Sequence, residues 1–588
     1  MKNKKVLIAV IALIVVAAII GVLFATGVLG GKKEEKAEVI TLTVFRGDPG
    51  DQPTEDNKIY KLIEEKFGVK FKFEYLAGDL DEKLGMMISG QDYPDLFCGG
   101  NSADLIISNG ALINLLDYIS PEKTPRLWAH IEPQKARLIE KDAEGKDVLY
   151  IVPNYGLPDG PQIALSVGGP AFFLQKQVLA DAGYPDVKNI TLDGYFDLIE
   201  QFLAKHPTRD DGTPYTGFAI LCEDWRHFCL INPVQHLMGR PNDGEVLIDV
   251  NDPDFHTETF IDKPYAKAYY KKLNEEFHKG LINKDTFVMN YDQYIAAISS
   301  GTILGMFDQA WDFGSATSAL IDAKMYENTY VALGPVYSEK DIEGVEMPTA
   351  NWKIEEHYLN GSLPNVRRGF GISVKSQYAE KIVAMWEEMM SDEWQMIFNW
   401  GIEGEDYIID ENGRLNMTAE QYANTQNAQW KLANKAEGFT QSSPKKQGWI
   451  MNDIEITDKD GNKKTVKAGN CWEPGNQDEI VFGQMNDYDK EFLSKYNYSK
   501  WADFVNPPIE LAPFGEAWQI DYTPVDVEHT DFCAIQDKDL PEIIMCDPAE
   551  FDAKWDAFVE EITPSAKVFQ DYMQEHVVIE AHKVLDNK

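Results

Sequence analysis

The first part of the chain alternates strand and helix patterns. Residues 69–75 alternate apolar and charged side chains one by one, which is the period-two pattern of a strand with one buried face. Residues 39–45 are rich in β-branched side chains and end at a turn cluster, so they predict a second strand. Between the two, residues 59–67 carry apolar side chains at helical spacing. A further helix is predicted over 80–88 and a short third strand near 93–97.

Strand, helix, strand, helix, strand in this order predicts a parallel sheet with right-handed crossovers. In such sheets ligands bind beyond the carboxyl ends of the strands. The loops that follow the three strands are therefore expected to line a cleft, and they carry the polar side chains Arg46, Asp48 and Asn101. We predict that these three residues contact a ligand.

The remainder of the chain is mostly helical, with a few strand patterns. Helices are predicted over 193–205, 265–279, 291–300 and 378–398, strands over 303–307 and 369–374, and a hairpin with its turn at 458–461. The strand at 303–307 runs into an aromatic loop that contains Asp308 and Trp311. The carboxyl end of that strand is expected to open on the cleft.

The N-terminus carries a hydrophobic run without a charged side chain from Val6 to Leu29, preceded by Lys2, Lys4 and Lys5. A helix of about 20 apolar residues spans a membrane, and basic residues stay on the cytoplasmic side. We therefore predict an uncleaved anchor that holds the rest of the chain at the extracellular face of the cell membrane. A cleaved secretory signal, which would release a secreted protein, is the alternative. No cysteine precedes Cys98, which excludes lipid attachment at an N-terminal cysteine.

Charge and composition narrow the class of protein. The 96 acidic and 55 basic residues give a net charge of −41, which repels phosphate backbones, so nucleic acid is not an expected partner. With 44% hydrophobic residues the chain can build a large core. No linker-like stretch divides the chain, which favours two large interwoven lobes over a string of small domains. The six cysteines could form disulfides or remain free thiols.

Motifs for catalysis or metal binding are missing from the sequence. It contains no phosphate-binding loop of the Walker type, no HExxH, no GxSxG and no CxxC. Cys222, His227, Cys229 and His236 have a spacing that fits no zinc motif, and they are interpreted as buried side chains of a helix. We therefore predict no catalytic residue, no metal site and no cofactor.

Aromatic side chains in loops are the strongest binding signal. Sugar rings present apolar faces and hydroxyl edges, so an aromatic side chain beside a carboxylate or amide is suited to hold them. Tyr155, Trp225, Trp311 and Trp400 are aromatic residues outside the predicted core stripes, and Asp308 lies close to Trp311 in the chain. We predict that all five contact a carbohydrate.

Several longer segments resemble one family. Residues 90–97, 269–285, 300–307 and 399–404 are similar to segments of family 1 extracellular solute-binding proteins of ABC importers, in particular the long oligosaccharide-type members from Gram-positive bacteria. Residues 551–558 resemble the C-terminal helix of that family. The resemblance implies two α/β lobes that close over a ligand, a carbohydrate ligand, the transmembrane subunits of an ABC permease as partners, and a monomer.

The complete interpretation is an α/β, two-lobed, periplasmic-binding-protein-like fold with a cleft between the lobes and crossover hinge segments, preceded by one transmembrane or signal helix. Its segments are an anchor and stalk over 1–37, lobe 1 over 38–157 and 303–368, and lobe 2 over 158–302 and 369–588. Two alternatives remain open at this point: a cell-surface glycoside hydrolase or lyase, and a membrane-tethered ligand sensor.

Overall fold

The first lobe is built on the predicted parallel unit. The computed structural model describes residues 39–154, 167, 169–240, 244–249, 252–352, 367–483, 485–506 and 520–585. Five strands form the sheet in the order β2-β1-β3-β13-β6, with β1 at Ile40–Arg46, β2 at Val69–Tyr75, β3 at Leu96–Cys98, β6 at Val152–Pro153 and β13 at Gly369–Ile372. Strand β1 pairs in parallel with both β2 and β3, and β13 runs antiparallel to β3. The predicted parallel arrangement of the first three strands is confirmed.

Local sequence signals set the limits of the first helix of this lobe. Helix α2 (Lys58–Phe67) begins after Asn57, whose side chain accepts a hydrogen bond from the Tyr60 backbone N–H. It ends at Gly68, which has φ 63°, a left-handed conformation that glycine adopts without strain. The other main helices of the lobe are α3 (Leu80–Gly90), α4 (Ala103–Ser108), α5 (Pro125–Ile131), α14 (Ala379–Met389) and α15 (Asp392–Asn399).

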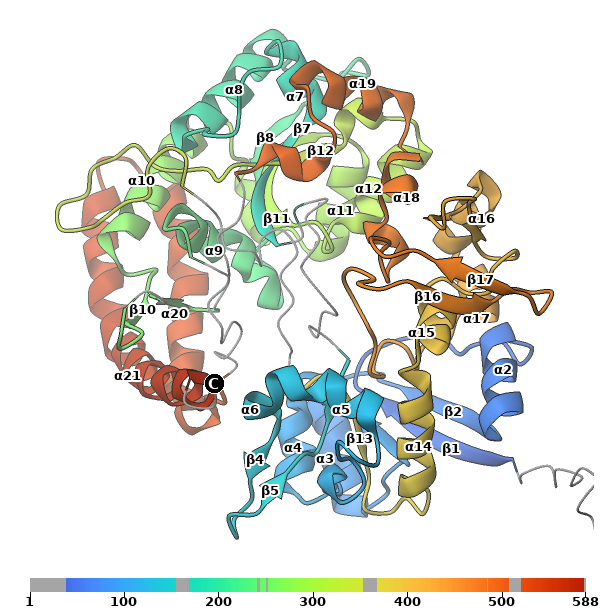
Figure 1. Ribbon diagram of the computed structural model, residues 1–588. Coiled ribbons are helices and arrows are strands. Elements are labelled where there is room, and N and C mark those ends of the chain that lie inside the picture. Colours follow the sequence, from blue (N-terminus) through green and yellow to red (C-terminus); the bar gives the residue numbers. More distant parts are fainter. Residues whose placement is uncertain are drawn as a thin grey trace, which may run out of the picture.

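The second lobe has its own sheet, in the order β12-β7-β11-β8. Its strands are β7 (Pro170–Gln175), β8 (Thr216–Ala219), β11 (Ile303–Gln309) and β12 (Tyr330–Leu333). Its helices include α7 (Lys176–Asp181), α8 (Leu192–Lys205), α9 (Phe228–Leu237), α10 (Pro264–His278), α11 (Tyr291–Ser299), α12 (Gly314–Asp322) and α19 (Asp487–Tyr496). The long helices α20 (Asp526–Met545) and α21 (Phe551–Leu585) pack against each other and against α10 and the small strand β10 (Thr257–Thr259), at the left of Figure 1.

The predicted division of the chain between the lobes is wrong for the strands β11, β12 and β13. Strands β11 and β12 belong to the sheet of the second lobe, although the prediction assigns 303–368 to the first. Strand β13 belongs to the sheet of the first lobe, although the prediction assigns the segment from 369 onward to the second. All three strands are almost completely buried, so their apolar pattern does not specify which sheet they join.

A small subdomain extends the first lobe. Its core contains Trp400, Tyr407 and Trp472, and it includes the hairpin of β16 (Ile454–Thr457) and β17 (Lys463–Val466). This confirms the predicted hairpin. The helix predicted over 378–398 is instead two helices, α14 and α15, because Ser391 between them is extended (φ −65°, ψ 152°). The remaining elements of the subdomain are β14 (Ile408–Ile409), β15 (Leu415–Asn416), α16 (Ala419–Gln426), α17 (Ala428–Asn434) and α18 (Asp478–Gly483).

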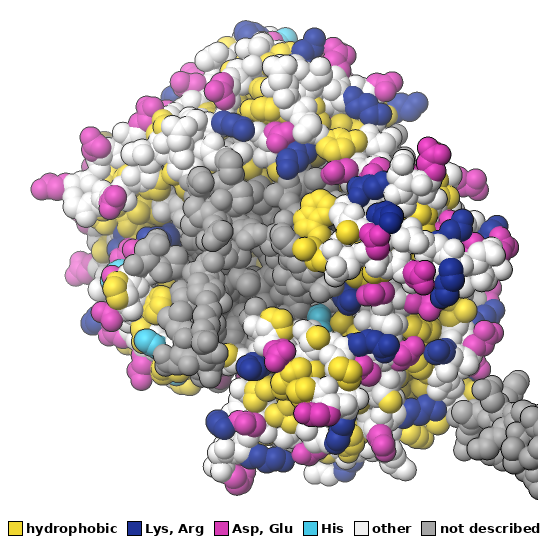
Figure 2. Space-filling view, viewed as in Figure 1, with side chains coloured by type: hydrophobic (Ala, Val, Ile, Leu, Met, Phe, Trp, Pro, Cys, Tyr) yellow, Lys and Arg dark blue, Asp and Glu magenta, His cyan; other side chains and the backbone are white. Residues whose placement is uncertain are grey.

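Of the expectations about the membrane span and the cysteines, the structure tests only the second. The predicted membrane span over 6–29 lies outside the described residues, and within the described part no helix is both long and apolar enough to cross a membrane. All six cysteines are free thiols, which decides between the two alternatives left open by the sequence. On the face in Figure 2, acidic and basic side chains are interspersed over both lobes.

Candidate functional site

The ends of the central strands lie next to the points where the chain passes from one lobe to the other. In the first lobe, β6 and β13 pair through Pro153 and Gly369, and the Asn154 N–H donates to the Arg368 carbonyl. In the second lobe, Gln309 at the end of β11 pairs with Pro170 at the start of β7. The chain therefore leaves one sheet and enters the other beside these strand ends.

A polar cluster occupies this edge of the first lobe. The carboxylate of Asp48 accepts from Arg46 Nη2 at 3.0 Å and from Arg368 Nη1 at 3.2 Å. Arg368 Nη2 also donates to Asn101 Oδ1 at 3.2 Å. The structure thus brings Arg46, Asp48 and Asn101 together through Arg368. We call these four residues the polar cluster.

An aromatic platform lies just beyond the end of β11 in the second lobe. The Trp225 and Trp311 rings stack with centroids 5.7 Å apart and an interplanar angle of 15°, and Trp225 also stacks on Phe228 at 5.9 Å. The two tryptophans nevertheless remain 58% and 56% exposed. We call Trp225, Phe228 and Trp311 the aromatic platform. Paired exposed indoles are costly to leave in water, so they mark a surface suited to an apolar face of a ligand.

Polar contacts hold the platform in place. Trp311 Nε1 donates to Gln309 Oε1 at 2.8 Å. The guanidinium carbon of Arg226 lies 4.3 Å from the centroid of the Trp225 ring and 3.8 Å from that of Tyr291, and Arg226 Nε pairs with Asp312 Oδ1 at 3.0 Å. The cation–π contacts and the ion pair hold the Trp225 loop against α11. The platform is therefore organised before any ligand arrives.

The prediction that Asp308 contacts a ligand is wrong. Its side chain is fully buried, because β11 continues to Gln309 and directs this residue into the lobe. Asp308 Oδ2 accepts from the Tyr294 hydroxyl at 2.8 Å and Oδ1 from the Gln309 N–H at 2.6 Å. Burial, and secondly the charge of Asp312, raise the pKa of Asp308 to about 7. Asp308 supports the base of the platform from within the core.

The prediction that Trp400 contacts a ligand is also wrong. Its side chain is completely buried against Tyr407, and Nε1 donates to the Cys471 carbonyl at 3.2 Å. The glycine after it suggested an exposed loop, but the subdomain folds over this position. Tyr155 lies outside the described residues, so its predicted contact remains a prediction.

Replacing Trp400 with phenylalanine is expected to destabilise the fold without affecting ligand binding. The smaller ring leaves a cavity and removes the donor to Cys471, which together should lower the free energy of unfolding by about 2 kcal/mol. Urea denaturation measures this loss. A loss of ligand affinity comparable to that of a platform variant would contradict the placement of Trp400.

The cysteine and histidine residues of the 222–236 segment do not converge on one point. His236 Nε2 accepts from the Val336 N–H at 3.2 Å, whereas His227 Nε2 lies 3.1 Å from Asp537 Oδ1. Burial lowers the pKa of His236 to about 3, so its ring is neutral and serves the core. The interpretation as a buried helix is confirmed for Cys229 and His236, which lie in α9, whereas Cys222 and His227 precede that helix and Cys222 is only partly buried.

Sequence reasoning missed several residues of the site, among them Phe228 of the platform. Arg226 directly follows Trp225, and Tyr291 begins a predicted helix, but nothing in the sequence indicates that the two meet. Arg368 immediately precedes the predicted strand at 369. Its position at a strand end was a usable signal, because ligands bind at the strand ends of such sheets.

Comparison with known proteins supports the fold. No protein-family profile and no curated protein matches the sequence. Solved structures do match. The chain is similar to an HMO binding ABC-transporter associated solute binding protein from Bifidobacterium longum infantis, with 13% identity, 92% of this chain and 98% of that chain covered, and a TM-score of 0.58.

Two further structures extend the comparison. An extracellular solute-binding protein from Bifidobacterium longum subsp. infantis has 13% identity, covers 92% of this chain and 98% of its own, and gives a TM-score of 0.61. The S. pneumoniae ABC-transporter substrate binding protein FusA, as an EF-hand mutant in complex with fructo-nystose, has 17% identity and a TM-score of 0.55. The match covers 93% of this chain and 100% of that chain. The chain therefore has the two-lobed α/β fold of solute-binding proteins along almost its whole described length.

Proposed function

We propose that this chain is an extracellular solute-binding receptor of an ABC import system, which captures an oligosaccharide or related glycan fragment and delivers it to the permease. In this proposal it carries out no chemistry of its own. The observation that carries the proposal is the exposed, stacked pair Trp225 and Trp311, just beyond the end of β11 that pairs with the start of β7.

Platform and polar cluster are complementary in chemistry. An indole surface packs on the C–H face of a sugar ring, while guanidinium, carboxylate and amide groups satisfy the hydroxyl edge. Arg46, Asp48 and Asn101 supply those groups in the first lobe, and Arg368 links them. The solved relatives include a protein in complex with fructo-nystose and one described as HMO binding, and both names support a carbohydrate for this chain.

Lobe closure would convert binding into a signal for the permease. A ligand that contacts both lobes binds the closed state more tightly, so it shifts the population toward that state. The permease subunits would then recognise the closed form. We further propose that the chain works as a monomer, held at the extracellular face of the membrane by its N-terminal helix, or secreted if that helix is cleaved.

Two carboxylates close to the platform, those of Asp308 and Asp312, are already occupied by structural contacts. A glycosidase needs two carboxyl groups about 5–9 Å apart across the scissile bond, one of them available as an acid. Asp308 is buried and hydrogen-bonded to Tyr294, and Asp312 is paired with Arg226. Both are engaged in holding the platform.

Isothermal titration calorimetry of the purified protein against a panel of neutral and acidic oligosaccharides tests the proposal. We expect saturable binding of at least one oligosaccharide and a change in tryptophan fluorescence, because both platform indoles are exposed before binding. Small-angle scattering should show a more compact particle with that sugar. Binding of peptides but of no sugar, or release of shorter sugars from the panel, would overturn the proposal.

A further inference from the structure

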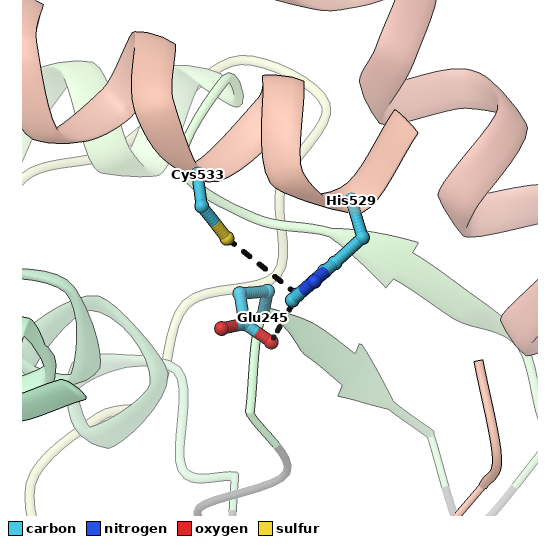
Figure 3. A group of neighbouring side chains, drawn as sticks. All are labelled: Glu245, His529 and Cys533. Atoms are coloured by element: carbon cyan, nitrogen blue, oxygen red, sulfur yellow. Dashed lines mark hydrogen bonds and ion pairs between the residues drawn. The ribbon is translucent and has the colours of Figure 1, made fainter. Parts of the chain in front are cut away.

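Three potential metal-ligating side chains meet in the second lobe, and none of them belongs to the aromatic platform. His529 and Cys533 are four residues apart on α20, so they project from the same face of that helix. Glu245 comes from the segment that leads into β9 (Val246–Ile248). Figure 3 shows the two helix side chains directed toward the glutamate. One ligand atom from each residue lies within 4.8 Å of the other two.

The separations match those around a tetrahedral zinc ion. Zinc binds cysteine sulfur at about 2.3 Å and histidine nitrogen or carboxylate oxygen at about 2.0–2.2 Å, which places tetrahedral neighbours roughly 3.3–3.6 Å apart. His529 Nε2 lies 3.4 Å from Glu245 Oε2 and 3.5 Å from Cys533 Sγ. Two of the three distances between the ligand atoms therefore already have the length that a shared zinc ion requires.

One hydrogen bond of His529 cannot account for its contacts with both Glu245 and Cys533. His529 Nε2 carries either one proton or one lone pair, so it can serve Glu245 or Cys533 but not both. A metal ion placed between the three atoms would be bound by all of them at once. The imidazole ring is also held in position, with its centroid 4.4 Å from that of Tyr522 and 4.7 Å from that of Phe569.

The local charge also favours a cation. Asp537, one turn beyond Cys533 on α20, adds a second carboxylate near Glu245. Among the described residues, the ion-pair partners of these two carboxylates are histidines, His529 for Glu245 and His227 for Asp537, and no lysine or arginine pairs with either. A divalent ion would neutralise charge that the side chains leave uncompensated.

We propose that Glu245, His529 and Cys533 form a zinc site, with water as the fourth ligand. The thiolate and imidazole select a borderline-soft ion such as Zn²⁺ over Ca²⁺ or Mg²⁺, which prefer oxygen ligands. The ion would join α20 to the segment before β9, two parts of the second lobe that are distant in the chain. This site differs from the sequence prediction of no metal and does not depend on the proposed sugar binding.

Zinc content of the purified full chain tests the proposal. After chelator treatment and dialysis against ZnCl₂, mass spectrometry of the metal should find one zinc per chain, and thermal unfolding should shift upward with Zn²⁺ but not with Mg²⁺. Cys533→Ser, His529→Gln and Glu245→Gln should each weaken zinc binding by about a hundredfold or more, since even outer ligands contribute roughly 10–100-fold.

His256→Gln is the matched control, because His256 also lies near a carboxylate, 3.9 Å from Glu258, but without a thiol. Cobalt gives a second measurement: the wild-type protein should show a thiolate-to-cobalt charge-transfer band that Cys533→Ser lacks. Circular dichroism of the metal-free variants verifies that each has folded. Wild-type protein that binds no zinc, or folded variants that bind it as wild type does, would overturn the proposal.

Discussion

Replacing both Trp225 and Trp311 with alanine is expected to raise the dissociation constant for the bound oligosaccharide by roughly a thousandfold, or about 4 kcal/mol. Aromatic side chains that bury a ligand face are the usual energetic centres of a binding site, and removal of one commonly costs about 2 kcal/mol. The two indoles stack on each other, so either single variant also disturbs its neighbour. Calorimetry with the sugar found in the panel measures the effect.

The controls separate binding from folding. Both indoles are more than half exposed, so the double variant should unfold at a urea concentration close to that of wild type. Trp430→Ala, on α17 of the subdomain, removes an indole away from the platform and should bind sugar normally. Wild-type affinity in a folded double variant would show that the platform does not hold the ligand.

The second large effect is a dependence of stability on pH that originates at Asp308. Its pKa is about 7 in the folded protein against an ordinary value of 3.8. Between these pH values the folded state retains a proton that the unfolded state has lost. The contribution of Asp308 to the free energy of unfolding is therefore fully present at low pH. It falls by about 4 kcal/mol in total as the pH rises from about 4 to about 7.

Asp308→Asn should remove this dependence, because the amide does not titrate. Relative to wild type, the variant should gain about 4 kcal/mol of unfolding free energy between about pH 4 and about pH 8. Urea denaturation at the two pH values measures it. Asp81→Asn, an exposed position on α3 with the same change in charge, should leave the wild-type slope almost unchanged. Parallel pH profiles for wild type and Asp308→Asn would contradict the buried, protonated state.

Sequence patterns predicted well wherever one face of an element is buried and the other is solvated. The alternation over 69–75 corresponds to β2 residue by residue, and Asn57 and Gly68 delimit α2 as caps. Local patterns of this kind depend on neighbours within one turn or one strand. Periodicity alone therefore predicts where these strands end. Arg46, Asp48 and Trp311 lie at or just beyond such strand ends.

Burial of single side chains could not be predicted in this way. Trp311 and Trp400 both follow an apolar element and precede a polar stretch, yet one is 56% exposed and the other fully buried. The difference arises because the subdomain covers Trp400, and that contact joins segments distant in the chain. Asp308 and Trp311 are three residues apart, but the extent of β11 directs only the second toward solvent.

By itself the sequence determined the α/β elements and the parallel order of the first three strands, because those follow from periodicity and strand order. The two-lobed class came from the lack of a linker-like stretch and from the family resemblance. The tertiary structure alone decided which sheet β11 and β13 join, that Arg226 packs on Tyr291, and that Glu245 meets His529 and Cys533. Each of these contacts connects residues whose local sequences carry no information about one another. They form only because burial of the two cores brings distant segments to the same place.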